Sequence, residues 1–319
     1  MKHILSNLNY LRLLIGYSLS IFVDSVVFMI AIKQIEILNN STTSYTALYW
    51  FHYLPSILFS LWIGAWIGFK KIEKIMRNTI FLRIMVLVIF IAVSGIENLT
   101  FIYLYIFLES LFAIFILPST DTLVTRIVDK ENRTEANAMV KLGFVLMQIL
   151  GYGVTTVLIK VDIPLSMVLI TCVILLLVGL VSFARIDVVF RNPLENKKSN
   201  VGREIKELLD YLLKNKLTLN IFILFAIAWL VASSIDIIVL SYLTQRASVS
   251  SENFGIVAIF VFIGMIVGSL LASYIYGRLP LKYVFSLPLI VYTFTVMSMY
   301  IFENWILTLP FFLLGGIRD

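Results

Sequence analysis

Residues 11–32 read LRLLIGYSLSIFVDSVVFMIAI, an apolar run with one carboxylic acid, Asp24, near its centre. A run of about 20 apolar residues crosses the ~30 Å hydrocarbon core of a bilayer as a helix. An ionisable side chain at that depth costs roughly 2.5 to 3.5 kcal/mol on insertion scales. Arg83, Glu109 and Asp236 lie inside other apolar runs. Charged side chains in several spans are typical of a transporter rather than of a membrane anchor.

The whole chain has the composition of a membrane protein. Of its 319 residues, 60% are hydrophobic and 14% are charged, and the mean hydropathy is +0.98. This composition predicts an all-α polytopic membrane protein. Ten apolar segments follow one another, at residues 10–35, 45–69, 74–95, 99–123, 137–159, 164–184, 216–243, 254–277, 281–302 and 305–317. The first nine are long enough to cross a bilayer, and the tenth is shorter.

Lys and Arg are unevenly distributed among the connecting loops. Because these residues stay on the cytoplasmic side, their positions predict the orientation. The loops near residues 70–77, 126–133 and 185–216 are rich in Lys and Arg, whereas the alternate loops carry only Lys160 and Arg246. We therefore expect a multi-pass protein of the cell membrane with a cytoplasmic N-terminus. The net charge of +6 follows from this bias and does not indicate nucleic-acid binding.

Residue types that usually catalyse reactions or bind metals are scarce. Cys172 is the only cysteine and lies within an apolar segment, and the two histidines, His3 and His52, are far apart in the sequence. The sequence contains no common hydrolase or metalloprotease motif and no phosphate-binding loop of the kind that ATP-driven pumps use. We therefore expect no enzymatic activity, no metal site and no cofactor.

The longest polar stretch divides the chain into two unequal parts. Within residues 187–216, Ile205, Leu208 and Leu212 recur at helical spacing among basic residues. This pattern is typical of an amphipathic helix on the inner leaflet, and an ordinary soluble connecting helix explains it nearly as well. The expected organisation is a six-helix N-terminal half (residues 1–187), a cytoplasmic linker (188–215) and an incomplete C-terminal half of four helices (216–319).

A weak internal repeat supports this division. The Ser-Leu pair at residues 60–61 precedes a glycine and a basic turn by the same interval as the pair at residues 269–270. Asp24 and Asp236 each lie within the first helix of a half. Parallel-repeat secondary transporters are built from two such halves, with the substrate site between them near the midplane.

At this level of organisation the chain resembles a known family. The segment VDKENRTEANAM, residues 128–139, is similar to the loop after the fourth helix in the macrolide, siderophore and multidrug exporters of the major facilitator superfamily. Residues 203–217 resemble the mid-chain helix of that branch, and the Phe-Gly pair at residues 254–255, with Gly264 and Gly268, resembles its eighth helix. The resemblance spans nearly the whole chain. It implies the major facilitator fold, with two six-helix halves related as a parallel repeat.

Three features depart from the family pattern. The signature after the second helix appears here as GAWIGFKK, residues 64–71, without its acidic residue. Gly151, Tyr152 and Gly153 replace the usual Gly-Pro of helix five. The family has twelve helices, whereas this sequence supplies about ten. We therefore expect a truncated second half, either in a fragment or in a naturally shortened homologue.

The charged residues inside the spans form the candidate coupling site. A carboxylate in a low dielectric binds a proton more readily, so it can carry one as access alternates between the two sides. Asp24 and Glu109 lie about midway along helices that line the cavity in the resembled fold. Arg83 is the expected counter-ion, and Asp236 is a further candidate for proton or substrate coupling. A purely structural ion pair is the alternative for these residues.

Glycines mark the expected close contacts between helices. Gly264 and Gly268 form a small-x-x-x-small pair that allows two backbones to approach closely, and Gly151 and Gly153 can do the same. In the resembled fold these two helices, five and eight, face each other across the halves. The packing is then either static or part of a sliding surface.

A salt bridge is expected at the cytoplasmic gate. Asp121 ends the fourth helix, and the resembled arrangement places it opposite Lys70 and Lys71. Exposed ion pairs usually contribute about 0 to 1 kcal/mol. That strength suits a gate, which must also open.

The expected function is secondary active transport. The resemblance implies proton-coupled efflux of an amphipathic small molecule, such as a drug, a macrolide or a siderophore-like compound. The expected partners are this small molecule, protons as the coupling ion and the lipid bilayer, and the oligomeric state stays open. The alternative is a truncated, non-transporting membrane partner or receptor derived from such a transporter.

Overall fold

The computed structural model describes residues 5–67, 71–93, 98–187, 201–275 and 281–316, and in these ranges the regular structure is helical, as the sequence predicts. The helices are α2 (Leu8–Asn39), α3 (Thr42–Ile67), α4 (Ile72–Val93), α5 (Leu99–Ala113), α6 (Ile116–Ile127), α7 (Arg133–Lys160), α8 (Leu165–Ala184), α9 (Val201–Lys214), α10 (Lys216–Ser241), α11 (Asn253–Ile275), α12 (Leu281–Ile301) and α13 (Leu309–Gly316). Short helical turns are η1 (Lys130–Asn132), η2 (Tyr242–Arg246) and η3 (Trp305–Thr308).

Most of these helices are long enough to cross a bilayer. Among the described residues, six spans meet this condition by both length and composition: residues 8–39, 72–93, 99–127, 130–160, 165–184 and 253–271. Helices α3 and α10 have 26 residues each and α12 has 21, which suffices by length. α3 also carries the polar groups of Tyr49, His52 and Tyr53. These helices coincide with the predicted crossing segments.

The predicted span at residues 99–123 is interrupted. A two-residue break separates α5 from α6. The cause lies just beyond the break, because Pro118 has no N–H to donate to the carbonyl of Ile114, four residues before it. The break follows Glu109 by about one helical turn. The interruption therefore lies in the same span as Glu109, further along the chain.

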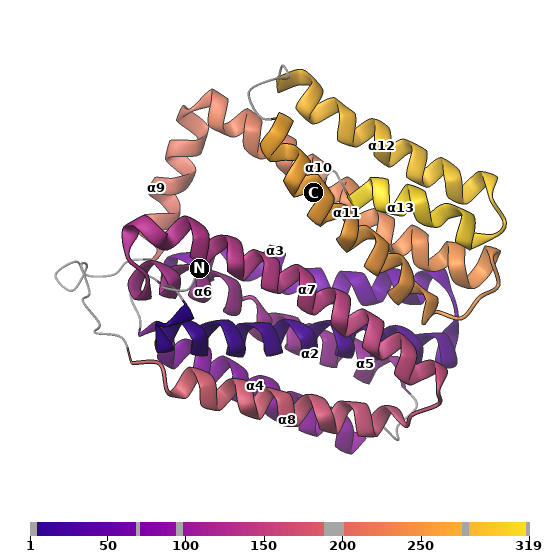
Figure 1. Ribbon diagram of the computed structural model, residues 1–319, viewed down its shortest axis with the longest axis horizontal. Coiled ribbons are helices and arrows are strands. Elements are labelled where there is room, and N and C mark those ends of the chain that lie inside the picture. Colours follow the sequence, from indigo (N-terminus) through magenta and orange to yellow (C-terminus); the bar gives the residue numbers. More distant parts are fainter. Residues whose placement is uncertain (1–4, 68–70, 94–97, 188–200, 276–280, 317–319) are drawn as a thin grey trace.

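Helix α2 is the centre of a first helix group, α2–α8. It packs against α3, α5, α6, α7 and α8. Leu13, Val23, Met29 and Ile30 of α2 are completely buried. In Figure 1, α2 runs through the middle of this group, with α4 and α8 below it and α3 and α7 above it. Close van der Waals packing of this kind stabilises helices in lipid, where the hydrophobic effect between helices is absent.

Helices α10–α13 form a second helix group, which lies above the first in Figure 1. Within it, α13 packs against α11 and α12. The two groups meet where α11 contacts α7 and where α10 contacts α3. A cavity lined by both groups lies at this meeting place.

The segment between the two groups contains the amphipathic helix that its spacing predicts. α9 exposes Leu208, Leu209 and Leu213. It contacts α3 of the first group and α10 of the second. In Figure 1 it lies at the end of the molecule that carries the N-terminus.

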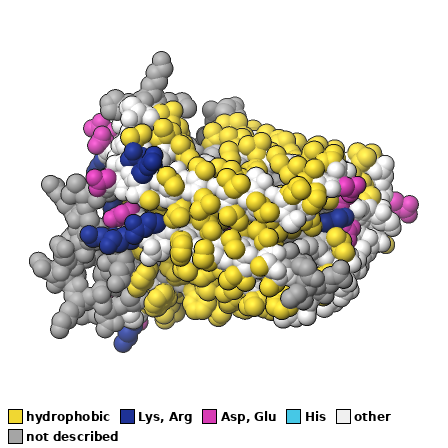
Figure 2. Space-filling view, turned by 90° about the horizontal axis from the view of Figure 1, so that it is seen from below, with side chains coloured by type: hydrophobic (Ala, Val, Ile, Leu, Met, Phe, Trp, Pro, Cys, Tyr) yellow, Lys and Arg dark blue, Asp and Glu magenta, His cyan; other side chains and the backbone are white. Residues whose placement is uncertain are grey.

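The outer surface is that of a protein surrounded by lipid. Figure 2 shows a band of hydrophobic side chains between two ends at which charged side chains gather. Helices α4 and α8 lie on this face and expose Ile89, Ile170 and Ile174, among others. Most Lys and Arg side chains in this view lie at the end that carries the N-terminus. The band corresponds to the hydrocarbon core of a bilayer.

Candidate functional site

Arg83 is the centre of a cluster of charged side chains inside the first helix group. Its side chain, from α4, is completely buried. Its Nε donates a hydrogen bond to Glu109 Oε1 of α5 at 2.9 Å, and one Nη donates to the same oxygen at 2.5 Å. The guanidinium also donates to the carboxylate of Asp24 and to the hydroxyl of Ser20, both on α2. We call Ser20, Asp24, Arg83 and Glu109 the buried cluster.

The buried cluster contains more negative than positive charge. With both carboxylates ionised, Asp24 and Glu109 leave one negative charge that Arg83 does not neutralise. Glu109 Oε2 is buried and accepts no hydrogen bond from the described part of the chain. Burying an uncompensated charge is costly, so the cluster favours uptake of one positive charge. A proton is the smallest ion that supplies it.

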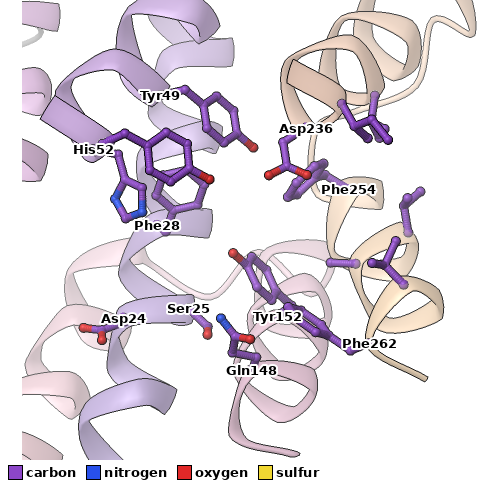
Figure 3. Close-up of a pocket in the computed structure, with 16 residues that line it drawn as sticks. Asp24, Ser25, Phe28, Tyr49, His52, Gln148, Tyr152, Asp236, Phe254 and Phe262 are labelled. Atoms are coloured by element: carbon purple, nitrogen blue, oxygen red, sulfur yellow. The ribbon is translucent and has the colours of Figure 1, made fainter. Parts of the chain in front are cut away.

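Asp24 connects the buried cluster to a cavity between the two helix groups. Its side chain is 30% exposed, against 8% for Glu109. The cavity measures about 220 Å³. Helices α2, α3 and α7 form its wall in the first group, and α10 and α11 form the wall in the second. Asp236 of α10 lies on the second wall, so each helix group contributes one carboxylic acid to the lining (Figure 3).

Aromatic side chains cover much of the cavity wall. The ring of Phe28 lies 5.3 Å from that of Tyr49 and 4.8 Å from that of His52. Across the cavity, the ring of Tyr152 lies 6.1 Å from that of Phe254. Such contacts between rings hold the wall in one arrangement.

His52 links this wall to the helix that carries Glu109. Its Nδ1 is hydrogen-bonded to the hydroxyl of Ser110 at 2.8 Å. Ser110 follows Glu109 on α5. This hydrogen bond therefore joins the cavity wall to the helix of the buried cluster that carries Glu109.

A second set of charges joins the two groups at the end away from the N-terminus. Lys33 Nζ of α2 lies 2.7 Å from Glu36 Oε2 and 2.9 Å from Glu252 Oε2, just before α11. Glu36 in turn accepts hydrogen bonds from the backbone N–H of Ser251 at 3.0 Å and from its hydroxyl at 2.8 Å. We call Lys33, Glu36, Ser251 and Glu252 the Lys33 bridge. It joins the two helix groups at this end.

The ionisation of Glu252 follows from these contacts. Burial by itself raises the pKa of a carboxyl group, but the hydrogen bonds and charge of Lys33 outweigh that effect and lower the pKa of Glu252 below its ordinary 4.5. Glu252 is therefore ionised at neutral pH, and the bridge is intact there.

The structure brings some predicted site residues together and leaves others apart. Asp24, Arg83 and Glu109 touch one another, and Asp236 lies across the cavity. For the predicted gate, Lys70 lies outside the described residues and Lys71 is exposed. The structure instead shows an electrostatic effect of Lys141, on α7, on Asp121. The gate of Asp121 with Lys70 or Lys71 stays a prediction.

Two of the predicted glycines lie at contacts of α7. A Cβ at Gly151 would come within 2.6 Å of Ser25 Cβ, next to Asp24 on α2. A Cβ at Gly153 would lie 3.2 Å from Ile259 Cδ1 of α11, across the two groups. Gly151 therefore permits close packing beside the buried cluster, and Gly153 lies at the contact between groups.

The predicted glycines of α11 have a different neighbour. A Cβ at Gly264 would collide with the carbonyl oxygen of Leu313 and with Gly316 of α13. Gly264 thus faces α13 inside the second group. The resemblance had implied that it faces helix five, which is α7. Gly268 is buried one turn further along α11.

Several site residues escaped sequence reasoning. Ser20 lies four residues before Asp24, hence on the same helix face, so its spacing was a usable signal. Tyr152, Gln148 and Glu252 gave no such signal, because each acts through helices distant in the sequence.

Two helix groups around a cavity that adjoins buried charges define a membrane transporter. The chain belongs to the Major Facilitator Superfamily, whose family model matches residues 13–318. No curated protein matches the sequence.

Solved structures of transporters share this fold. The nucleoside transporter NupG is 13% identical at a TM-score of 0.77, over 97% of this chain and 79% of that chain. A bacterial homologue of the human lysosomal transporter Spinster, inward-facing and occupied, is 13% identical at a TM-score of 0.70, over 97% and 70%. A D-xylose–proton symporter is 12% identical at a TM-score of 0.54, over 97% and 79%. At these identities the likeness concerns the fold alone.

Proposed function

We propose that the protein is a proton-coupled secondary transporter that exports an amphipathic small molecule from the cell. The observation that carries this proposal is the excess carboxylate of the buried cluster, in contact with the cavity through Asp24. Membership of the Major Facilitator Superfamily supports transport. A neighbour in fold is named as a D-xylose–proton symporter, so proton coupling occurs in proteins of this architecture.

The buried cluster supplies a mechanism for coupling. When Asp24 is ionised, Arg83 binds both carboxylates and ties α2 to α4 and α5. When Asp24 takes up a proton from the cavity, its attraction to Arg83 weakens and the guanidinium is left to Glu109. The contact between α2 and α4 then changes with the protonation state. That change is the proposed link between proton binding and helix movement.

The two helix groups are the proposed moving parts. We assign them to residues 1–187 and 216–319, joined by the linker 188–215, with the N-terminus in the cytoplasm of a cell-membrane protein. The Lys33 bridge then closes the external side. A salt bridge of Asp121 with Lys70 or Lys71 is the matching gate on the cytoplasmic side. Transport requires each gate to break in turn.

Efflux from cells tests the proposal. Cells that produce the protein are loaded with ethidium, a cation, or Nile red, a neutral compound, and loss of fluorescence is followed. We expect efflux that stops on addition of a protonophore and persists after ATP depletion while the proton gradient is clamped. Efflux that follows ATP under a clamped gradient contradicts coupling to protons. Absence of efflux for every amphipathic probe supports the non-transporting alternative.

Thiol labelling tests the orientation. Single cysteines replace Ser41, Ser250 or Asn132 in a Cys172→Ser background, and an impermeant reagent is added to intact cells. The cysteines at positions 41 and 250 should react, and the one at 132 should not. The reverse pattern overturns the assigned topology.

A further inference from the structure

We infer that the cavity binds a small organic cation and that Asp236, rather than Asp24, is the residue that holds its ammonium group. The inference rests on the proposed transport function, since it names the substrate class of the same cavity.

The charges around the cavity favour a cation. Two carboxylates line it, Asp24 and Asp236, and the lining includes no Lys or Arg among the described residues. The nearest guanidinium, that of Arg83, is completely buried behind Asp24 and engaged by two carboxylates. In a water-poor site this imbalance attracts a positive ligand and repels a negative one.

The two carboxylates point in different directions. Figure 3 shows the Asp236 carboxylate directed at the space between Tyr49 and Tyr152, whereas the Asp24 carboxylate is turned away from that space. Asp24 is turned towards Arg83, its partner in the buried cluster. Asp236 acts electrostatically on Tyr49, Tyr53 and Tyr152, three tyrosines of the same lining. The roles therefore divide, with Asp24 for the proton and Asp236 for the ligand.

The rings of the cavity lining form a surface that suits a quaternary or aromatic ammonium. Tyr49, Tyr152, Phe254 and Phe262 all line the cavity, and the rings of Tyr152 and Phe262 stack 6.0 Å apart. Cations bind to the faces of aromatic rings, and combinations of rings are the usual receptor for such ligands. This apolar surface would not stabilise a hydrated metal ion.

Two buried polar atoms of the wall have acceptor capacity left. Gln148 Oε1 and the Tyr49 hydroxyl are buried and form no hydrogen bond with the described residues. Both belong to side chains that line the cavity. An ammonium ligand supplies the positive charge or N–H groups that these oxygens lack. An anionic ligand does not.

The volume limits the size of the ligand. The cavity of about 220 Å³ is smaller than the ~300 to 1,000 Å³ of pockets that hold drug-sized compounds. A single-ring ammonium suits this volume better than a macrolide does.

Direct binding to the purified full chain tests the inference. Radiolabelled phenyltrimethylammonium is the probe, and unlabelled benzenesulfonate and benzyl alcohol, an anion and a neutral compound with the same ring, are the competitors. We expect saturable binding that neither competitor reduces. Asp236→Asn should weaken binding by about tenfold or more, because it removes the charge and keeps the shape. Asp236→Glu should restore part of it.

Matched variants show whether binding depends on the carboxylate at the site or on the net charge of the protein. Asp162→Asn removes a carboxylate from an exposed turn with φ of 55°, a conformation that Asn also adopts, and should bind like the wild type. Tyr152→Phe keeps the ring and should bind nearly as well, whereas Tyr152→Leu should lose about threefold or more. Size-exclusion profiles establish that each variant is folded.

The outcomes distinguish this inference from the proposed function. Binding that Asp236→Asn leaves unchanged, or tighter binding of benzenesulfonate, overturns the cation site. If a folded protein exports Nile red with a proton gradient but does not bind phenyltrimethylammonium, the proposed function is supported and this inference is contradicted. If the protein binds the cation through Asp236 but shows no proton-driven transport, this inference is supported and proton coupling is contradicted.

Discussion

The buried cluster and the Lys33 bridge have the same charges and different surroundings. Each places one cation between two carboxylates. The Arg83 side chain is completely buried, whereas the Lys33 side chain is 18% exposed. A charge that loses its partner costs more where its side chain is fully buried, as at Arg83, than where it is partly exposed, as in the Lys33 bridge at 12 to 18%. Burial therefore makes the first a site that must exchange charge and the second a contact that can open.

The largest expected effect is loss of the cation from the buried cluster. Arg83→Ala strands two carboxylates in an apolar interior, and we expect a loss of about 3 to 5 kcal/mol of stability. The measurement is the amount and thermal stability of folded protein in detergent. Arg83→Lys, which keeps the charge, is the control and should be milder. Normal abundance and stability of Arg83→Ala mean that the cluster is not held by charge.

Loss of one carboxylate from the same cluster should raise the stability of the folded protein or leave it unchanged. Asp24→Asn keeps the shape, removes the excess negative charge and leaves Arg83 paired with Glu109. We expect thermal stability equal to that of the wild type or higher. A drop as large as that of Arg83→Ala contradicts the charge count on which the mechanism depends.

Breaking the Lys33 bridge should have a smaller effect on stability and a visible effect on access. Lys33→Met should cost less stability than Arg83→Ala, because the side chains of the bridge are 12 to 18% exposed whereas that of Arg83 is completely buried. A cysteine that replaces Ala258 in the cavity, in a Cys172→Ser background, reports external opening through its labelling rate. We expect faster labelling in Lys33→Met and no change with the surface variant Lys130→Met. Equal labelling rates in Lys33→Met and in the protein with the intact bridge mean that the Lys33 bridge does not close the cavity.

The smallest expected effect is the pH dependence of this closure. Since the pKa of Glu252 is lowered from 4.5 in the bridged state, its contribution is present above about pH 4.5 and is lost as the pH falls through the lowered value. External labelling of the Ala258 position should therefore rise in acid relative to Glu252→Gln, which has no such group. A rise of the same size in both proteins assigns the effect to other residues.

Much of the fold could be predicted from the sequence, because the signals for membrane-spanning helices are local. The length and composition of each helix, such as α8 at residues 165–184, depend only on the segment itself. The break before Pro118 was equally local but was overlooked in a span that is apolar on both sides. The Major Facilitator Superfamily was predicted from segments such as residues 128–139 and is confirmed, whereas the exporter branch stays a prediction.

The site was less predictable because its contacts join distant segments. Burial cost singled out Asp24, Arg83 and Glu109, but the sequence gives no distance between them. The pairing of Lys33 with Glu252 joins residues that look like ordinary loop charges. The partner of Gly264 was mistaken, because close packing of a glycine predicts a neighbour without identifying the helix.

Proton movement in reconstituted vesicles tests the central claim most directly, that the excess carboxylate of the buried cluster couples protons to transport. Vesicles containing the protein, with a trapped pH indicator, receive a gradient of the probe that cells export. We predict proton flux opposite to the probe in the wild type, and exchange of the probe without proton flux in Asp24→Asn. Proton flux in Asp24→Asn equal to that of the wild type contradicts the account.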